Sequence, residues 1–391
     1  NNTDGIYADA GSQPTITGNT FTGNTRPVSV YAARINNTIS GNTYTGNTKD
    51  YIEVQAATLD ENLTYVWAKD NGPYVVVGDV YVQRANNGSQ LSTLQIASGT
   101  TVKFTSGADL FIGHESNGGY RGALTATGVT FTSLDSTGWP GIDFRNYSED
   151  AGCLLDSCTI ENATDGIYCT SSNPTITNCT IQNNTDGIEA DAGSQPTITG
   201  NTFTGNTFPV KIYSRYIDNN LSGNTYSGNF AADNSSSDYI YVYGDGDDYR
   251  LSENKTYDWL KDGAPYRMMH NTHVWEDNDN NQVAILKIYP QVTLAFEPSK
   301  YLYIGSTASG DAGALQADGV TFTCVDSASA WAQIRMRTYS RDDLTLVENS
   351  IIERAVDGIY CESASPTITN CTIRNNTDGI YADAGSQPTI T

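Results

Sequence analysis

Carboxylate side chains are the groups in this sequence most suited to chemistry. The sequence Asn-Thr-Asp-Gly occurs at residues 2–5, 184–187 and 376–379. A pair of carboxylates can cleave a glycosidic bond, because one protonates the leaving oxygen while the other activates water. An active site is normally single, whereas Asp-Gly recurs with the repeats of the chain, including Asp165-Gly166 and Asp357-Gly358. We therefore interpret Asp-Gly as a turn in which the aspartate caps backbone amides.

Two acidic clusters are candidates for calcium binding, since oxygen-rich loops suit a hard cation. Their spacing does not match an EF-hand, and a solvated acidic loop is the alternative interpretation. No other cofactor is predicted. The candidate ligands are Asp245, Asp247 and Asp248 in one cluster and Glu276, Asp277 and Asp279 in the other.

Basic and imidazole groups offer weaker sites. Arg335, Arg337 and Arg341 stand near Asp342 and Asp343, as a lyase with a basic residue beside calcium ligands would require. Alternation along the strand places the first two arginines outward, and surface ion pairing or a subunit contact is the preferred interpretation. The chain has only three histidines, and the His-x-x-His pair at 270 and 273 would face opposite sides of a strand, so no zinc site is expected.

Cysteines occur in pairs that are present or absent together. Cys169 and Cys179 stand in one repeat and Cys361 and Cys371 in another, whereas the repeats at 5–19 and 187–201 lack both. An in-coil disulfide within each pair is a candidate in an oxidising exterior. Two alternatives stay open: Cys158 stacking on Cys179 one coil away, and thiols that simply fill the interior.

Glycosylation sequons point to an extracellular or cell-surface protein, although an Asn- and Thr-rich repeat also generates them by chance. The candidate acceptors are Asn36, Asn62, Asn87, Asn146, Asn162, Asn220, Asn234 and Asn254.

Composition narrows the set of partners. The net charge of −23 and the pI near 4.2 disfavour nucleic acid and anionic membranes, which carry the same sign of charge. No apolar run reaches the length of a membrane span.

Duplication organises the elements that must position these residues. Residues 1–17 recur unchanged at 375–391 and with one substitution, Glu189, at 183–199. The sequence therefore predicts a first module at 1–182, a second at 183–374 and the start of a third at 375–391.

A shorter repeat of about 22 residues runs inside each module. Each unit holds two or three short alternating runs separated by turn residues, which predicts short strands stacked coil upon coil around a continuous interior. Ile16 and Phe21 would both point inward if a corner near Gly18 resets the phase. Asparagines that recur after the glycines should form ladders along the stack, as at Asn201 and Asn224 or Asn206 and Asn229. The predicted fold is all-β, a right-handed parallel β-helix with some longer side loops.

The repeats D-G-I-Y, P-T-I-T and C-T-I resemble those of the pectin-lyase-like superfamily, particularly NosD-type repeats of extracellular surface proteins and adhesins. The resemblance implies the right-handed parallel β-helix. In polygalacturonase-like members an Asn-Thr-Asp motif supplies one catalytic carboxylate, but the Gly-His-Gly and Arg-Ile-Lys motifs of that family are missing here. We therefore expect no enzymatic activity.

The preferred function is a structural rod that binds copies of itself, head to tail and also laterally, in a filament, sheath or surface layer. Two alternatives remain open. One is an adhesin or carbohydrate-binding stalk in which Trp67, Trp259 and Trp275 stack on surface glycans. The other is a polysaccharide lyase or hydrolase.

Overall fold

The structure is a computed structural model, and it describes the chain except for residues 86–89, 117, 232–234, 245–249, 277–281 and 309. Two compact units are present: unit 1 contains residues 1–209 and 224–237, and unit 2 contains residues 210–223 and 238–391. The module boundaries predicted at 182 and 374 reflect sequence repetition, and each lies inside one of these units. No described helix is long and apolar enough to cross a membrane.

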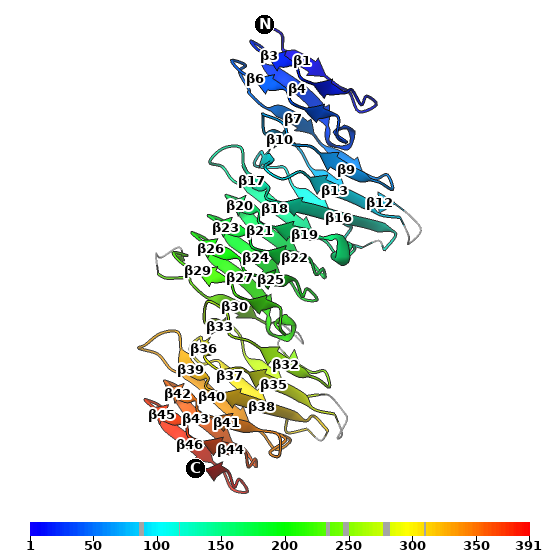
Figure 1. Ribbon diagram of the computed structural model, residues 1–391. Coiled ribbons are helices and arrows are strands. Elements are labelled where there is room, and N and C mark those ends of the chain that lie inside the picture. Colours follow the sequence, from blue (N-terminus) through cyan, green and yellow to red (C-terminus); the bar gives the residue numbers. More distant parts are fainter. Residues whose placement is uncertain (86–89, 117, 232–234, 245–249, 277–281, 309) are drawn as a thin grey trace. The chain divides into compact units, whose positions relative to one another are not determined.

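Unit 1 is a stack of parallel strands in three principal sheets, confirming the predicted β-helix (Figure 1). Its first sheet contains β1 (Asp4–Tyr7), β4 (Arg26–Tyr31), β7 (Ile52–Gln55), β10 (Tyr74–Val76), β14 (Thr101–Phe104), β17 (Thr130–Ser133), β20 (Thr159–Glu161), β23 (Thr180–Gln182), β26 (Thr202–Thr204) and β29 (Thr225–Tyr226). Its second sheet contains β8 (Ala57–Leu59), β11 (Val80–Val82), β15 (Leu110–Ile112), β18 (Trp139–Phe144), β21 (Ala163–Cys169) and β24 (Asp186–Ala190). Its third sheet contains β9 (Thr64–Trp67), β13 (Ser92–Ile96), β16 (Tyr120–Thr127), β19 (Leu154–Asp156), β22 (Thr175–Thr177) and β25 (Thr197–Thr199).

Unit 2 repeats this arrangement. Its first sheet contains the residues of β27 (Phe208–Tyr213) from Val210 onward, β30 (Ile240–Tyr243), β33 (Tyr266–Met268), β36 (Thr293–Phe296), β39 (Thr321–Cys324), β42 (Ile351–Glu353) and β45 (Thr372–Arg374). Its second sheet contains β31 (Arg250–Leu251), β34 (Thr272–Val274), β37 (Tyr301–Ile304), β40 (Trp331–Met336), β43 (Ala355–Cys361) and β46 (Asp378–Ala382). Its third sheet contains β32 (Thr256–Trp259), β35 (Ala284–Ile288), β38 (Gly313–Asp318), β41 (Leu346–Glu348), β44 (Thr367–Thr369) and β47 (Thr389–Ile390).

Smaller elements complete the described structure. They are the paired strands β2 (Ile16–Thr17) and β5 (Ile39–Ser40), the paired strands β3 (Thr20–Phe21) and β6 (Thr43–Tyr44), β12 (Arg84–Ala85) against β16, β28 (Leu221–Ser222), and the 3-10 turns η1 (Ala32–Arg34), η2 (Asp150–Gly152) and η3 (Ser214–Tyr216).

The length of a coil varies along the stack. Strand register joins Ile160 to Ile181 and Phe203 to Tyr226, so these two coils keep the short period predicted from the sequence. Phe322 pairs with Ile352, which makes that coil distinctly longer. The short period therefore describes the Asn- and Thr-rich repeats, and the longer coils carry the side loops.

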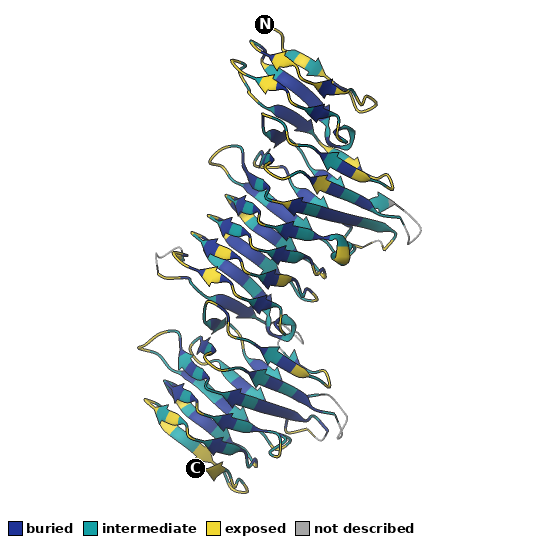
Figure 2. Ribbon diagram, viewed as in Figure 1, coloured by how far each residue is buried: buried dark blue, intermediate teal, exposed yellow. Residues whose placement is uncertain are grey.

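Period-2 alternation decides which side chains enter the interior. In β37, Leu302 and Ile304 are buried while Tyr301 and Tyr303 are partly exposed. Figure 2 shows this alternation as buried residues interleaved with more exposed ones along the strands. The predicted corner is also present, because Gly18 has φ +66° and lets both Ile16 and Phe21 turn inward.

Asparagine ladders line two corners of the coils, as predicted. The side-chain amide of Asn206 donates to the side-chain oxygen of Asn229 (3.1 Å) and to the carbonyl of Ile181 (2.9 Å), and all of these groups are buried. A second ladder joins Asn201 to Asn224 (3.1 Å). Each rung satisfies backbone groups that the corner would otherwise leave buried without a hydrogen bond.

Candidate functional site

The outward face of the second sheet in unit 1 gathers carboxylates. The strands point Ile142, Ile167 and Ile188 inward. The residues that follow them, Asp143, Tyr168 and Glu189, therefore face outward. Register places Phe111 beside Asp143, Asp165 beside Asp186, and Tyr168 beside Glu189 on neighbouring coils. We call this surface the acidic face; its carboxylates are those of Asp79, Asp109, Asp143, Asp165, Asp186 and Glu189.

A bulge in β21, opposite Gly141, shapes the acidic face, and its extra residue is Gly166. The register between β18 and β21 shifts after Gly141, where φ is +145°. A Cβ at this position would lie only 1.7 Å from the carbonyl oxygen of Asp165, so the approach requires glycine. Beside the bulge is a small cleft of about 140 Å³, and its walls include Asp109, Phe111, Pro140, Asp143, Asp165 and Tyr168.

Burial and mutual repulsion alter the ionisation of this cleft. The pKa of Asp109 is raised to about 7, first by burial and then by the charges of Asp79 and Asp143, against the opposing effect of Arg145. Burial also raises the pKa of Asp143, although the Arg145 guanidinium donates to its Oδ2 at 2.9 Å. Arg145 itself lies 3.7 Å from the ring centroid of Phe111. A carboxylic acid that titrates near neutrality beside carboxylates could act as a general acid.

Three further carboxylates converge on the same face. One oxygen from each of Asp165, Asp186 and Glu189 lies within 4.8 Å of the other two, a spacing that could hold a hard divalent cation such as Ca²⁺. Sequence reasoning missed this cluster. The available signal was that Asp165 and Asp186 occupy the same place in successive repeats, although strict alternation from Ile167 and Ile188 would have placed them on the inward phase.

The predicted role of Asp-Gly was wrong, and the reason is steric. Asp4-Gly5, Asp165-Gly166 and Asp186-Gly187 lie within β1, β21 and β24 and not in turns. A Cβ at Gly187 would lie 2.4 Å from the carbonyl oxygen of Pro209 on the next coil. Glycine is required there because neighbouring coils approach closely.

Unit 2 carries different chemistry on the equivalent face. The segment 331–340 aligns with 139–148, so Arg335 replaces Asp143 and Arg337 matches Arg145. Tyr301 stands in place of Asp109, and its ring centroid lies 3.7 Å from that of Tyr303. We call this surface the aromatic face; it consists of His273, Tyr301, Tyr303, Arg335, Arg337 and Tyr360.

Ion pairs and ring contacts organise the aromatic face. Arg335 and Arg337 both bind Glu362, at 2.9 and 3.3 Å, whereas Arg341 binds Asp343 at 2.8 Å. The arginines predicted as a group therefore engage two different acids in surface ion pairs, the interpretation preferred from the sequence. The His273 ring lies 5.4 Å from that of Tyr303 and 8° from parallel to it, and burial, followed by the charges of Arg337 and Arg250, lowers the pKa of His273 to about 4.

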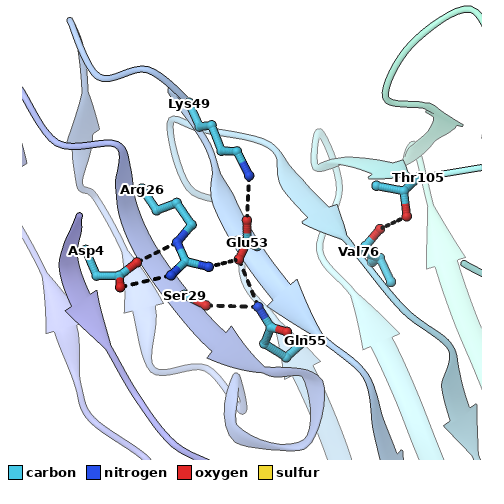
Figure 3. Close-up of polar contacts among 8 residues, drawn as sticks. All are labelled: Asp4, Arg26, Ser29, Lys49, Glu53, Gln55, Val76 and Thr105. Atoms are coloured by element: carbon cyan, nitrogen blue, oxygen red, sulfur yellow. Dashed lines mark hydrogen bonds and ion pairs between the residues drawn. The ribbon is translucent and has the colours of Figure 1, made fainter.

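A third polar cluster surrounds Glu53 on the first sheet of unit 1 (Figure 3). Its side chain is 4% exposed, and the carboxylate accepts from Arg26, Lys49 and Gln55, each at 2.9 Å. Arg26 also forms a two-pronged ion pair with Asp4, at 2.6 and 2.9 Å. Because these partners engage both oxygens of Glu53, the cluster is suited to holding coils together and not to binding a ligand.

Most of the predicted calcium ligands lie outside the described residues, namely Asp245, Asp247, Asp248, Asp277 and Asp279. Glu276 is described and partly buried after β34, and its backbone amide donates to the carbonyl of Ala312 at 2.9 Å. Calcium binding by these two clusters stays a prediction.

The seven cysteines are free thiols in the structure, so no disulfide joins Cys169 to Cys179 or Cys361 to Cys371. Cys158 and Cys179 are the pair brought together, with the backbone amide of Cys158 donating to Sγ of Cys179 at 3.4 Å, as the stacking alternative required. Burial raises the pKa of the Cys153 thiol to about 12. These thiols therefore serve chiefly as small interior residues.

The predicted glycosylation acceptors and the tryptophans differ in exposure to solvent. Asn62, Asn146, Asn162 and Asn254 are exposed, Asn36 and Asn220 are partly exposed, and Asn87 and Asn234 lie outside the described residues. Trp67 and Trp259 are only 1% and 0% exposed. Their rings fill the interior and cannot stack on a surface glycan, so the predicted role of these two residues was wrong. Trp275 is 9% exposed, and its ring lies 4.5 Å from that of His273.

Comparison with known proteins rests on a family model. The model described as a right-handed β-helix region matches residues 110–258 and 314–391. Searches of curated proteins and of solved structures found no match. The family match covers more than half of the residues and agrees with the parallel stacked sheets of both units, and the chain belongs to the right-handed β-helix family.

Proposed function

We propose that this protein is a structural β-helix of an extracellular assembly, a filament, sheath or surface layer, in which modules stack on copies of themselves. The observation that carries the proposal is that the two units preserve their interiors while their outward faces diverge. The family includes both enzymes and non-enzymes, so membership alone does not decide between them.

Interior contacts recur in both units with nearly the same geometry. Trp139 stacks on Phe104 with ring centroids 4.1 Å apart, and its indole donates to the carbonyl of Glu161 at 3.0 Å. In unit 2, Trp331 stacks on Phe296 at 4.4 Å and donates to the carbonyl of Glu353 at 2.9 Å. Retention of such contacts is the pattern of a scaffold.

Carboxylates of the acidic face are only partly retained, since Asp357 and Asp378 keep the positions of Asp165 and Asp186 whereas other positions change. Tyr301, Arg335 and Tyr381 occupy the positions of Asp109, Asp143 and Glu189. A module copied for its chemistry would keep these groups, whereas a module copied for its shape need not. The net charge of −23 and the exposed sequons favour an extracellular setting.

Negative-stain electron microscopy of the purified chain across dilution tests the proposal, together with light scattering. Filaments or sheets with an axial repeat are expected. Ile390→Lys is the variant expected to disrupt assembly. Ile390 is 55% exposed on the last described strand, whereas its counterpart Ile198 is 0% exposed beneath a further coil. This variant should stay monomeric, and Tyr7→Lys on an outward position should still assemble. Single particles of the unmodified chain at high concentration would contradict the proposal.

Cleavage of a polysaccharide is the second candidate, favoured by the Asp109 carboxylic acid beside Asp143 in the small cleft. The chain is incubated with neutral and uronate-containing polysaccharides, and reducing ends and unsaturated products are measured. Turnover that Asp109→Asn abolishes would establish this activity. If neither the unmodified chain nor the Asp109→Asn variant released products, the scaffold role would be the one that remains.

A further inference from the structure

A larger cleft, of about 670 Å³, opens on the outward face of the third sheet in unit 2. It lies over β35, β38 and β41, where register places Lys287 beside Gln316 and Gln316 beside Leu346. This volume falls in the range of small-ligand sites. The cleft lies on a different sheet from the acidic and aromatic faces, so it is separate from the sites described above.

Apolar side chains form part of its wall, although the strand positions face outward. Leu344 and Leu346 are only partly buried, and Pro290 is exposed beside them. At the equivalent positions of unit 1, Ala97, Ser98 and Gly152 stand in place of Tyr289, Pro290 and Leu344, whereas Leu154 matches Leu346. The cleft therefore presents apolar surface that the β-helix itself does not require.

The tyrosine of the wall is held in a fixed orientation. The Tyr289 hydroxyl donates to Oδ1 of Asp258 at 3.0 Å, and the Lys287 ammonium lies 4.8 Å from its ring centroid. A ring restrained at both its edge and its face can present a flat surface without losing further side-chain entropy when a ligand binds.

Hydrogen-bond acceptors surround the apolar wall. Asp318 pairs with Glu348 across β38 and β41 and is oriented by the side-chain amide of Asn349, at 2.7 Å. Asp342 is oriented by the Ser365 backbone amide, at 2.8 Å. With Asp343, four carboxylates line the cleft against the single ammonium of Lys287, so it repels anionic ligands.

We infer that this cleft binds a neutral saccharide unit. A pyranose ring has an apolar C–H face that would pack against Tyr289 and Leu344, and its hydroxyls would donate to the carboxylates at the rim. The charge of the lining excludes uronates and sulfated sugars from the expected ligands.

Comparison of the modules provides matched variants. The segment 286–291 aligns with 94–99, so Tyr289 replaces Ala97, and the segment 340–350 aligns with 148–158, so Leu344 replaces Gly152. The coil folds with alanine and glycine at these positions in unit 1. Tyr289→Ala and Leu344→Gly should therefore remove the binding wall while preserving the fold.

Saturation-transfer NMR and calorimetry test the inference, with methyl glycosides of glucose, galactose, mannose and N-acetylglucosamine as probes and methyl glucuronide as the charged counterpart. We expect saturable binding of at least one neutral glycoside with a Kd on the order of 1 mM. The double variant Tyr289→Ala/Leu344→Gly should weaken that binding at least tenfold, and Tyr301→Ala on another sheet should leave it unchanged. Circular dichroism confirms that each variant is folded.

Three results would overturn the inference: saturable binding of none of the neutral glycosides, equal binding by the double variant, or preference for the glucuronide. The outcome is independent of the assembly proposal, since filaments can form whether or not the cleft binds a sugar.

Discussion

The outward faces of the second sheet differ sharply between units 1 and 2, although the same backbone carries both. Burial and neighbouring carboxylates raise the pKa of Asp109 in the acidic face. At its equivalent position in the aromatic face, Tyr301 stacks on Tyr303, and Arg335 lies 4.6 Å from the ring centroid of Tyr360. The outward positions of a β-helix strand therefore accept opposite chemistries.

Interior positions, in contrast, keep the same contacts in both units. Tyr74 donates to the carbonyl of Ala68 at 2.7 Å, and its counterpart Tyr266 donates to the carbonyl of Leu260 at the same distance. An interior side chain contacts the coils above and below, so a change in one coil disturbs two more. An outward side chain contacts mainly water and its neighbours in the ladder, and substitutions there cost little.

The largest expected effect comes from removing a matched interior ring. Trp139→Ala and Trp331→Ala should each lower the free energy of unfolding by about 3–5 kcal/mol, because each leaves a cavity beside a stacked phenylalanine. Urea unfolding followed by hydrogen exchange assigns each loss to its own unit.

The control is Tyr381→Ala, an outward residue that is 48% exposed and should cost less than about 0.5 kcal/mol. If the two tryptophan variants differed by several kcal/mol, the interiors would not be energetically equivalent, and the comparison between the units would fail.

Much of the fold could be predicted because it depends on periodicity. Alternation in short runs and the short repeat predicted the stacked strands, the corner at Gly18 and the ladder that includes Asn206 and Asn229. Side loops lengthened other coils, such as the one that joins Phe322 to Ile352, and no local pattern encodes that change.

The candidate site was less predictable, because it depends on which coils become neighbours. Asp109 and Asp143 lie in long coils, where Leu110 pairs with Ile142 and the short repeat no longer indicates alignment. The role of Gly141 depends on another coil that lies so close that a Cβ there would be 1.7 Å from the carbonyl oxygen of Asp165, a feature visible only in three dimensions. Asp-Gly was misread for the same reason, since turns and close strand contacts both favour glycine.

The asparagine ladder should show the next largest effect. Asn206→Ala removes side-chain bonds to Asn229 and Ile181 and leaves backbone groups buried without partners, so we expect a loss of about 2–3 kcal/mol. Asn19→Ala, at an exposed rung whose side-chain amide donates to Asn42 at 3.2 Å, is the control and should cost less than about 0.5 kcal/mol. Equal losses from the two variants in urea unfolding would show that burial does not set the strength of a rung.

Stability should respond to pH with opposite signs in the two units. The folded pKa of Asp109, about 7, exceeds its ordinary value of 3.8, so unit 1 binds more protons when folded and should lose stability as pH rises from 4 to 7. The folded pKa of His273, about 4, lies below its ordinary value of 6.5, so unit 2 should gain stability as pH rises from 4 to 6.5.

Hydrogen-exchange mass spectrometry on peptides of each unit measures both slopes at once. Asp109→Asn should flatten the slope of unit 1, and His273→Tyr, which introduces the residue found at Tyr81 in unit 1, should flatten that of unit 2. Slopes of the same sign in the unmodified chain would show that other groups dominate the pH dependence.

The smallest expected effect is that of salt. Repulsion among partly exposed carboxylates destabilises unit 1, so raising NaCl from about 0.05 to about 0.5 M should stabilise it relative to unit 2 by on the order of 0.5 kcal/mol. CaCl₂ at the same ionic strength separates screening from ion binding. Extra stabilisation of unit 1 that Asp186→Asn removes would identify an ion held by Asp165, Asp186 and Glu189. Equal effects of both salts would assign the response to screening alone, and no differential response would mean that the charge contrast between the faces does not affect stability.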